Sequence, residues 1–206
     1  MEATRDRIIV ATNELFRRQG YNGTSLTQIS AASAATIGSI YHFFPGGKEA
    51  LAAEVVRTTG GVYRDLFVAI STEAPNPVQA FSDFFAGAAA VLEDSGYIDP
   101  CPIGGIAREV ANTSEPLRLA AAAAFQSWID AASTYLHSAG VPEATARELA
   151  ALFVATVEGT FVVSRTQRSP EALLAAGKHV GELARQAIVN GKRETKKQRH
   201  SPARPR

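Results

Sequence analysis

The sequence predicts an all-α protein, and three observations lead to this fold class. Apolar residues recur at intervals of three and four through most of the chain. Glycine, proline and capping residues divide these periodic segments into pieces of helical length, and we find no convincing strand pattern. Alanine-rich runs such as 120–124 are strong helix formers. With 206 residues, 46% of them hydrophobic, the chain also has enough apolar material for a core.

Four helices are expected in the first part of the chain. A glycine, Gly20, ends the first, and Ser25 with Gln28 fits a capping box that opens the second. A break around residues 35–37 separates the second helix from the third, which Pro45 and the following glycines end. The expected ranges are 4–18, 25–34, 38–44 and 48–72.

Five more helices and a tail are expected after residue 72. Ser114, Pro142 and Pro170 are start signals, and Gly140 marks an end. The expected helices are 78–94, 103–111, 114–139, 142–165 and 170–190. From Gly191 the chain is basic and almost without apolar anchors, which favours disorder. We therefore expect three units: 1–47, 48–190 and a disordered tail, 191–206.

Charge is distributed unevenly. Residues 1–48 hold five Lys and Arg against three acids, residues 49–191 hold nine against sixteen, and residues 192–206 hold seven against one. Basic ends around an acidic middle suit a protein that meets a polyanion at its ends. A solvated tail without any partner remains an alternative for the last segment.

Two short helices after a longer one form the pattern of a helix-turn-helix unit. Its core would come from apolar residues at helical spacing: Leu15, Phe16, Leu26, Ile29, Ala32, Ile40 and Phe44. The opposite side of the third helix would then face a DNA major groove, where hydroxyl, imidazole and apolar groups can contact base edges.

Several short sequence motifs in this region resemble those of the DNA-binding domain of the TetR family of bacterial regulators. They are Thr4–Ile9, Leu15-Phe16, Gly20-Tyr21, Thr24–Leu26, Ile29, Gly38–Phe44 and Lys48-Glu49. The segments Phe44–Glu49 and Cys101–Gly104 look like the LmrA/YxaF branch of that family. The resemblance implies an all-α homodimer with an N-terminal three-helix helix-turn-helix domain. It also implies a C-terminal helical domain that binds a ligand and dimerises through its last two helices.

Carried over by position, the resemblance gives a set of DNA-contacting residues on and around the third helix. They are Thr27, Thr36, Ile37, Gly38, Ser39, Tyr41, His42 and Lys48. Simpler readings stay open: Tyr41 as a core aromatic, His42 as a surface residue without a role and Lys48 as an ordinary first-turn lysine. Where the family often has glycine and a basic residue, this chain has Ala34 and Ile37. Because 26–47 carries no formal charge apart from His42, we expect shallow salt dependence of DNA binding.

Clustered aromatics in the acidic body suggest a cavity for a small hydrophobic or aromatic effector, a cationic one included. The expected lining is Phe84, Phe85, Cys101, Arg108, Phe125, Trp128, Phe153 and Phe161. Core packing is the competing role for each aromatic, and Cys101 is expected to be a buried or lining residue and not a nucleophile. Polar groups that could orient the ligand are Arg108, Gln126, Asp130 and Glu158.

Two apolar stripes on the last two long helices are expected to form the dimer interface. They are Leu149, Leu152, Thr156, Thr160 and Val163, then Gly177, Val180, Gly181, Ala184 and Ile188. A two-fold dimer matches a palindromic operator. Ligand binding would shift the helix 48–72 through the segment 102–111 and lower operator affinity.

Other classes of protein are disfavoured. The four histidines show no metal-binding pair, G-x-S-x-G is absent and Gly46-Gly47-Lys48 lacks the rest of a phosphate loop, so no enzyme and no metal or other cofactor is expected. The single cysteine excludes a disulfide framework. We expect a cytoplasmic protein without a membrane span. The alternative function is a DNA-binding protein of the same kind that acts through protein contacts, without small-molecule control.

Overall fold

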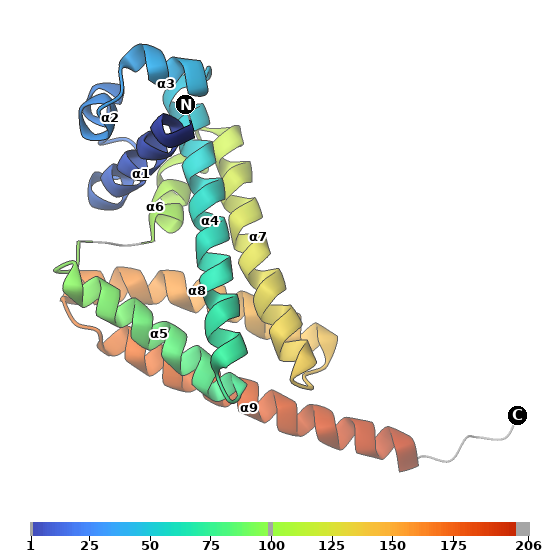
Figure 1. The fold of residues 1–206 in the computed structure, drawn as a ribbon. Coiled ribbons are helices and arrows are strands. Elements are labelled where there is room, and N and C mark those ends of the chain that lie inside the picture. The colour runs from blue at the N-terminus through green and yellow to red at the C-terminus, as the bar shows by residue number, and fades with distance from the viewer. Residues whose placement is uncertain (1, 99–100, 201–206) are drawn as a thin grey trace, which may run out of the picture.

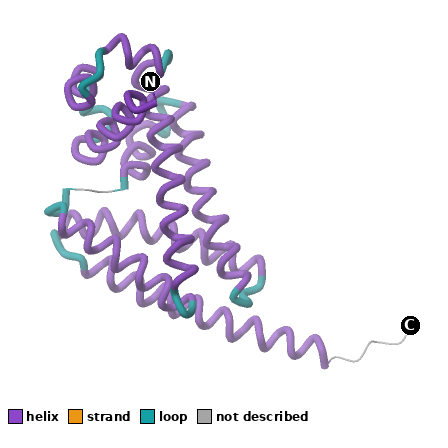
Figure 2. Tube along the Cα trace, in the orientation of Figure 1, coloured by secondary structure: helices purple, strands orange, loops and turns teal. Residues whose placement is uncertain are grey.

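The computed structural model describes residues 2–98 and 101–200, with side chains placed in 3–98 and 101–193. In this part of the chain every regular element is an α-helix (Figure 2). The helices are α1 Glu2–Gln19, α2 Leu26–Ser33, α3 Ile37–Phe43, α4 Gly47–Glu73, α5 Pro77–Asp94, α6 Pro102–Val110, α7 Glu115–Ser138, α8 Glu143–Gln167 and α9 Glu171–His200. The all-α prediction is confirmed, and the expected helices lie within a few residues of the observed ones up to α8.

Local capping sets several helix starts. The Ser25 hydroxyl accepts from the Gln28 amide and the Gln28 side chain returns to the Ser25 backbone, which is the expected capping box. Thr36 caps α3 in the same way by accepting from the Ser39 amide. Ala34 ends α2 in the left-handed region at a φ of 51°, a conformation that costs a non-glycine residue about 1 kcal/mol.

The arrangement of the helices separates a helix-turn-helix end from a helical body (Figure 1). α1, α2 and α3 lie together at one end, and α4 runs from them into the body alongside α7. α5, α8 and α9 form a layer across the other end of α4, with α5 along α9 and α7 along α8.

Two hydrophobic clusters hold these parts together. One joins the helix-turn-helix end to the first half of α4, to α6 and to the start of α7, so α6 shares a core with α1–α3. The other lies among α4, α5, α7, α8 and α9. Of the core expected for the helix-turn-helix unit, Phe16, Ile29, Ile40 and Phe44 are buried and Leu15 and Leu26 partly buried, but Ala32 is exposed.

The prediction of disorder from Gly191 is wrong for residues 191–200, because α9 continues to His200. Gly191 does not end the helix: it is buried where α9 passes the loop between α7 and α8, and a Cβ there would lie 2.6 Å from the Gly140 carbonyl oxygen. The following Lys, Arg, Glu and Gln residues are good helix formers, and no proline occurs before Pro202. The rest of the expected tail, 201–206, lies outside the described residues.

Candidate DNA interface and effector cavity

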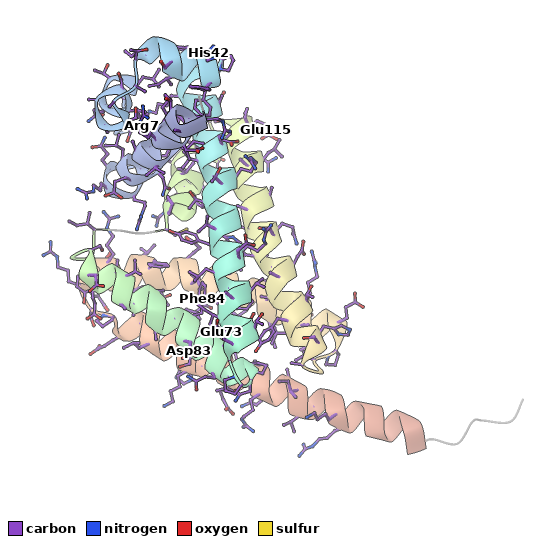
Figure 3. All side chains as sticks on the ribbon, viewed as in Figure 1. Arg7, His42, Glu73, Asp83, Phe84 and Glu115 are labelled. Atoms are coloured by element: carbon purple, nitrogen blue, oxygen red, sulfur yellow. The ribbon has the colours of Figure 1, made fainter. Side chains whose placement is uncertain are left out.

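Most of the residues predicted from the sequence to contact DNA lie on the outer side of α3. Ile37 and Tyr41 are 42% and 50% exposed, and Thr36, Gly38 and His42 are exposed as well. Figure 3 shows His42 at the outer end of the molecule. Ser39 is partly buried and its hydroxyl lies 2.9 Å from that of Thr36. Thr27 is exposed in the first turn of α2, so these side chains share one end of the protein.

Tyr41 is therefore not a core aromatic. Its ring rests against the start of α4, where a Cβ on Gly47 would lie 3.2 Å from Tyr41 Cε1. Gly47 has a φ of +64°, so a side chain there would be both strained and in contact with this ring. This contact covers one edge of the Tyr41 ring, and the rest of the ring is accessible to a binding partner.

Lys48 has a different setting from the one expected for a simple phosphate contact. Its Nζ lies 4.2 Å from the centre of the Tyr21 ring, and the side chain is partly buried. Burial lowers the pKa of Lys48, and the charge of Glu109 opposes that change. Lys48 thus belongs to the junction between the helix-turn-helix end and α6, and its contact with phosphate stays a prediction.

That junction is built on Glu109, near the end of α6. Its Oε1 accepts a hydrogen bond from the Tyr21 amide at 3.1 Å and its Oε2 one from the Asn22 amide at 2.7 Å. The carboxylate fits because residue 20 is a glycine, whose missing Cβ would lie 2.3 Å from Glu109 Oε1. Hydrogen bonds from two amides to one charged group are stronger than neutral ones. Glu109 therefore ties α6 to the turn that follows α1.

The body encloses a cavity of about 290 Å³ between α4, α5, α7 and α8. Its walls are almost wholly apolar and rich in rings, and Figure 3 shows Phe84 in this region. The lining residues are Arg17, Tyr63, Leu66, Phe67, Ile70, Phe84, Gly87, Ala88, Val91, Cys101, Trp128, Phe153, Val154, Val157, Glu158 and Phe161. A volume near 300 Å³ is at the lower end of the range for small-molecule sites.

Five of the eight residues predicted to line the cavity do so: Phe84, Cys101, Trp128, Phe153 and Phe161. Phe85 is fully buried behind the lining, with its ring centre 5.8 Å from that of Phe153. Phe125 packs edge-on against Trp128 from outside. Arg108 lies on a neighbouring surface hollow, so the prediction for these three residues is wrong.

The largest omission from the prediction is the α4 wall. Tyr63, Leu66, Phe67 and Ile70 follow one another at spacings of three, one and three, which is one face of a helix. This stripe is readable from the sequence, but the expected lining contained no residue of the helix 48–72. Among the proposed polar groups, Gln126 and Asp130 bond to each other on the surface, and Glu158 alone lines the cavity.

Glu158 is the acidic residue in the otherwise largely apolar lining of this cavity. Its Oε1 is buried and has no hydrogen-bond partner, while Oε2 lies against Gly104 of α6, where a Cβ would be only 1.8 Å away. Burial raises the pKa of Glu158; the Cys101 thiol and the charge of Arg108 oppose the rise. Burial also raises the pKa of the Cys101 thiol well above its usual value, so the cysteine is a neutral lining residue.

The stripe on α9 that was predicted to meet a second subunit is covered within the chain. Gly177, Val180, Gly181 and Ala184 are buried, and Ile188 is partly buried, because α9 packs on α5. A Cβ on Gly177 would lie 2.8 Å from Phe85 Cβ, and one on Gly181 would lie 2.9 Å from the Val78 carbonyl oxygen. These glycines permit close approach of α9 to α5, and this half of the predicted interface is wrong.

The outer face of α8 is, by contrast, apolar and uncovered. Leu152, Val162 and Val163 are 46%, 43% and 42% exposed, and small residues lie between them. In the predicted α8 stripe, Leu149, Thr156 and Thr160 are partly buried. α8 is also the one described helix long and apolar enough to span a membrane, judged by length and composition only. A surface helix of a monomer normally has a polar outer face.

Comparison with known proteins identifies both parts of the chain. Residues 8–55 match the family model of bacterial regulatory proteins of the tetR family, and residues 77–179 match that of the C-terminal domain of LmrA/YxaF-like transcriptional regulators. The HTH-type transcriptional regulator YxaF of Bacillus subtilis is 35% identical over 88% of this chain and 95% of its own. LmrA of the same organism is 32% identical over 87% of this chain and 96% of its own.

Solved structures show the same fold. A TetR transcriptional regulator from Legionella pneumophila superposes with a TM-score of 0.76 at 21% identity, covering 85% of this chain and 94% of that one. One from Chloroflexus aurantiacus gives 0.73 at 28% identity, covering 90% and 96%. The chain therefore belongs to the TetR family of helix-turn-helix transcriptional regulators, which are not enzymes, and carries an LmrA/YxaF-like C-terminal domain.

Proposed function

We propose that this protein is a cytoplasmic, ligand-responsive repressor that binds a palindromic operator as a homodimer and is released by a small hydrophobic effector. The observation that carries the proposal is an apolar cavity joined to the helix-turn-helix end by one short helix. Glu158 of the cavity touches the first turn of α6, and Glu109 near the last turn holds the loop after α1.

α6 is the coupling element of this proposal. Cys101 lies directly before it and Ile106 is fully buried in the cluster that α6 shares with α1–α3. An effector that changes the position of Glu158 acts on the start of α6, and Glu109 carries the displacement to Tyr21 and Asn22. The effector lowers operator affinity only if it binds the two positions of α6 unequally.

The outer face of α8 supports the homodimer. Leu152, Val162 and Val163 form an exposed apolar stripe on a helix whose other side is already buried. Covering the stripe with the same stripe of a second copy gives an isologous two-fold contact. This contact removes apolar surface from water, and each Å² that is buried stabilises the dimer by roughly 25 cal/mol. The domain boundary near residue 47 belongs to the same proposal, since α4 starts at Gly47 and continues into the body.

The first test is selection of bound fragments from the host genome by the purified protein at one stated salt concentration. Recovery of an inverted repeat supports a dimeric operator-binding protein, and the neighbouring genes narrow the effector class. Failure to enrich any sequence contradicts the proposal. Candidate effectors are then scored by release of the selected fragment and by fluorescence of Trp128, the single tryptophan, which lines the cavity.

The coupling role of α6 has its own test, the variant Glu109→Ala. We expect effector binding to be unchanged in Trp128 fluorescence, while the coupling between effector and operator falls by about 0.5–2 kcal/mol. Glu73→Ala removes an exposed carboxylate at the far end of α4 and serves as control (Figure 3). Full operator release by the Glu109→Ala protein would exclude this carboxylate as the link.

A further inference from the structure

The cavity combines aromatic walls with one acid, Glu158, whose buried Oε1 has no hydrogen-bond partner. Among the described side chains, Glu158 Oε1 and Ser164 Oγ are the buried polar atoms without a hydrogen bond, and Glu158 is the one that lines the cavity. A buried carboxylate oxygen without a donor is costly, so its persistence in a pocket points to a donor that arrives with the ligand.

Arginines lie near this carboxylate: Arg17 lines the same cavity, and Arg108 and Arg165 line an adjoining hollow that Glu158 also lines. Arg108 acts on Glu158 from a distance, and in the described part of the chain no ion pair involves Glu158. Arg17 lines the cavity but interacts with Glu14 of its own helix. The Cys101 thiol, which burial keeps neutral, forms a hydrogen bond with the Glu158 carboxyl group.

Aromatic rings around the cavity complement a cation. Tyr63 and Trp128 stand edge to face with ring centres 6.0 Å apart, and Phe67, Phe84, Phe153 and Phe161 complete the ring-bearing lining. The faces of such rings attract an ammonium group, most strongly where water is excluded. A cationic ligand gives the ionised Glu158 a counter-charge, whereas an anionic ligand would be repelled by the ionised carboxylate and a neutral ligand would offer it no counter-charge.

We propose that the effector is a compact lipophilic cation, a one- or two-ring aromatic molecule whose protonated amine donates a hydrogen bond to Glu158 Oε1. Its ring packs between Phe84 and Trp128, and its size is limited by a cavity of about 290 Å³. The inference rests on the proposed function, because it names the class of ligand for the same regulatory cavity. Beyond the proposed function, this inference assigns to Glu158 the selection of a cation among hydrophobic molecules of equal size.

The test uses three probes of one shape and different charge: phenylbutylamine, phenylbutanol and phenylbutyrate. Binding is followed by calorimetry and by fluorescence of Trp128. We expect the amine to bind at least about tenfold more tightly than the alcohol, and the acid to bind more weakly than both. In Glu158→Gln we expect the amine to lose its advantage, while the affinity for the alcohol changes little.

Glu143→Gln is the matched control, since it removes an exposed carboxylate from the first turn of the same helix. The control should keep the preference for the amine. Equal or tighter binding of the alcohol or the acid by the wild-type protein, or no binding of any probe, would overturn the inference. So would a preference for the amine that survives in Glu158→Gln.

Operator release separates this inference from the proposed function. If the amine binds through Glu158 but leaves the protein on its DNA, the ligand class stands and the regulatory function falls. If instead a neutral molecule binds and releases the DNA while the amine does neither, the regulatory function stands and the ligand class falls.

Discussion

The helix-turn-helix end and the helical body differ in how their polar groups are satisfied. At the helix-turn-helix end, Ser25 and Thr36 cap their own helices through residues three positions away, and His42 of α3 lies at the surface. In the body, Glu158 keeps a carboxylate oxygen buried without a partner inside apolar walls.

The two regions therefore differ in how readily their conformation can change. Each cap stabilises the start of its helix by about 1 kcal/mol, and the core that α2 and α3 share with α1 holds them in place, which suits a rigid surface that reads DNA. A buried carboxylate oxygen without a hydrogen-bond partner leaves a free energy that a ligand can recover, which suits a responsive site. The two parts meet at α6, and the predictions below separate them.

The largest effect is expected from breaking the proposed dimer at α8. Val163→Arg places a charge in the exposed apolar stripe, and we expect a monomer in size-exclusion chromatography with light scattering. Operator affinity should fall by about a hundredfold or more, because linked binding to two half-sites is lost. Leu119→Arg, on a 53% exposed residue of α7, should leave a dimer. A dimeric Val163→Arg protein would place the interface elsewhere.

Tyr41→Ala should affect the DNA-facing end alone. We expect operator affinity to fall by about 1–3 kcal/mol, the usual range for one specific base contact, with little change in melting temperature. Val10→Ala changes an even more exposed residue of α1 in the same domain and is the control. Gel shifts at fixed salt measure the effect. A Tyr41→Ala protein with full affinity would remove this residue from the interface.

The two glycines of α6 offer a paired test of the junction between cavity and coupling helix. A Cβ on Gly104 would meet Glu158 Oε2, whereas Gly105 has open space. We expect Gly104→Ala to destabilise the fold by about 1–3 kcal/mol through overpacking. Gly105→Ala should be neutral or stabilise it through helix propensity. Denaturant unfolding compares the two, and equal stabilities would contradict the close contact with Glu158.

The smallest effect concerns Glu158 and pH. Burial raises the pKa of this carboxyl, so the folded protein holds the proton more tightly than the unfolded chain does. The protonated, neutral form of Glu158 therefore stabilises the folded protein at acid pH, and this stabilisation is lost as the pH rises through the pKa of Glu158 in the folded state. Glu158→Gln should therefore be more stable than wild type at neutral pH, by about 1 kcal/mol or roughly 2–4 °C. The difference should shrink toward pH 4.5, the ordinary carboxyl value.

The neighbours of Glu158 do not produce this pH profile themselves. Burial raises the pKa of Tyr63 to about 12 and that of the Cys101 thiol well above its ordinary value, so both stay neutral below pH 8. A difference between variant and wild type that does not change with pH would assign the effect to packing and not to ionisation.

The helices and the helix-turn-helix unit could be predicted from the sequence, because they depend on interactions between residues close in the chain. The capping box at Ser25 and the start signals at Ser114 and Pro142 led to helices that the structure contains. The all-α class and the family resemblance rest on the same local signals, and the family is confirmed by the matches to both domains.

Which face of each helix packs against which neighbour could not be predicted from the sequence, because it depends on the folded chain as a whole. The stripe on α9 has the spacing of an interface, but whether α5 or a second copy covers it depends on the path of the whole chain. Glu158 meets Gly104 from 54 positions away and Glu109 meets Tyr21 from 88 positions away. Such contacts bring together residues that no periodic pattern links, and burial then changes the chemistry of those residues.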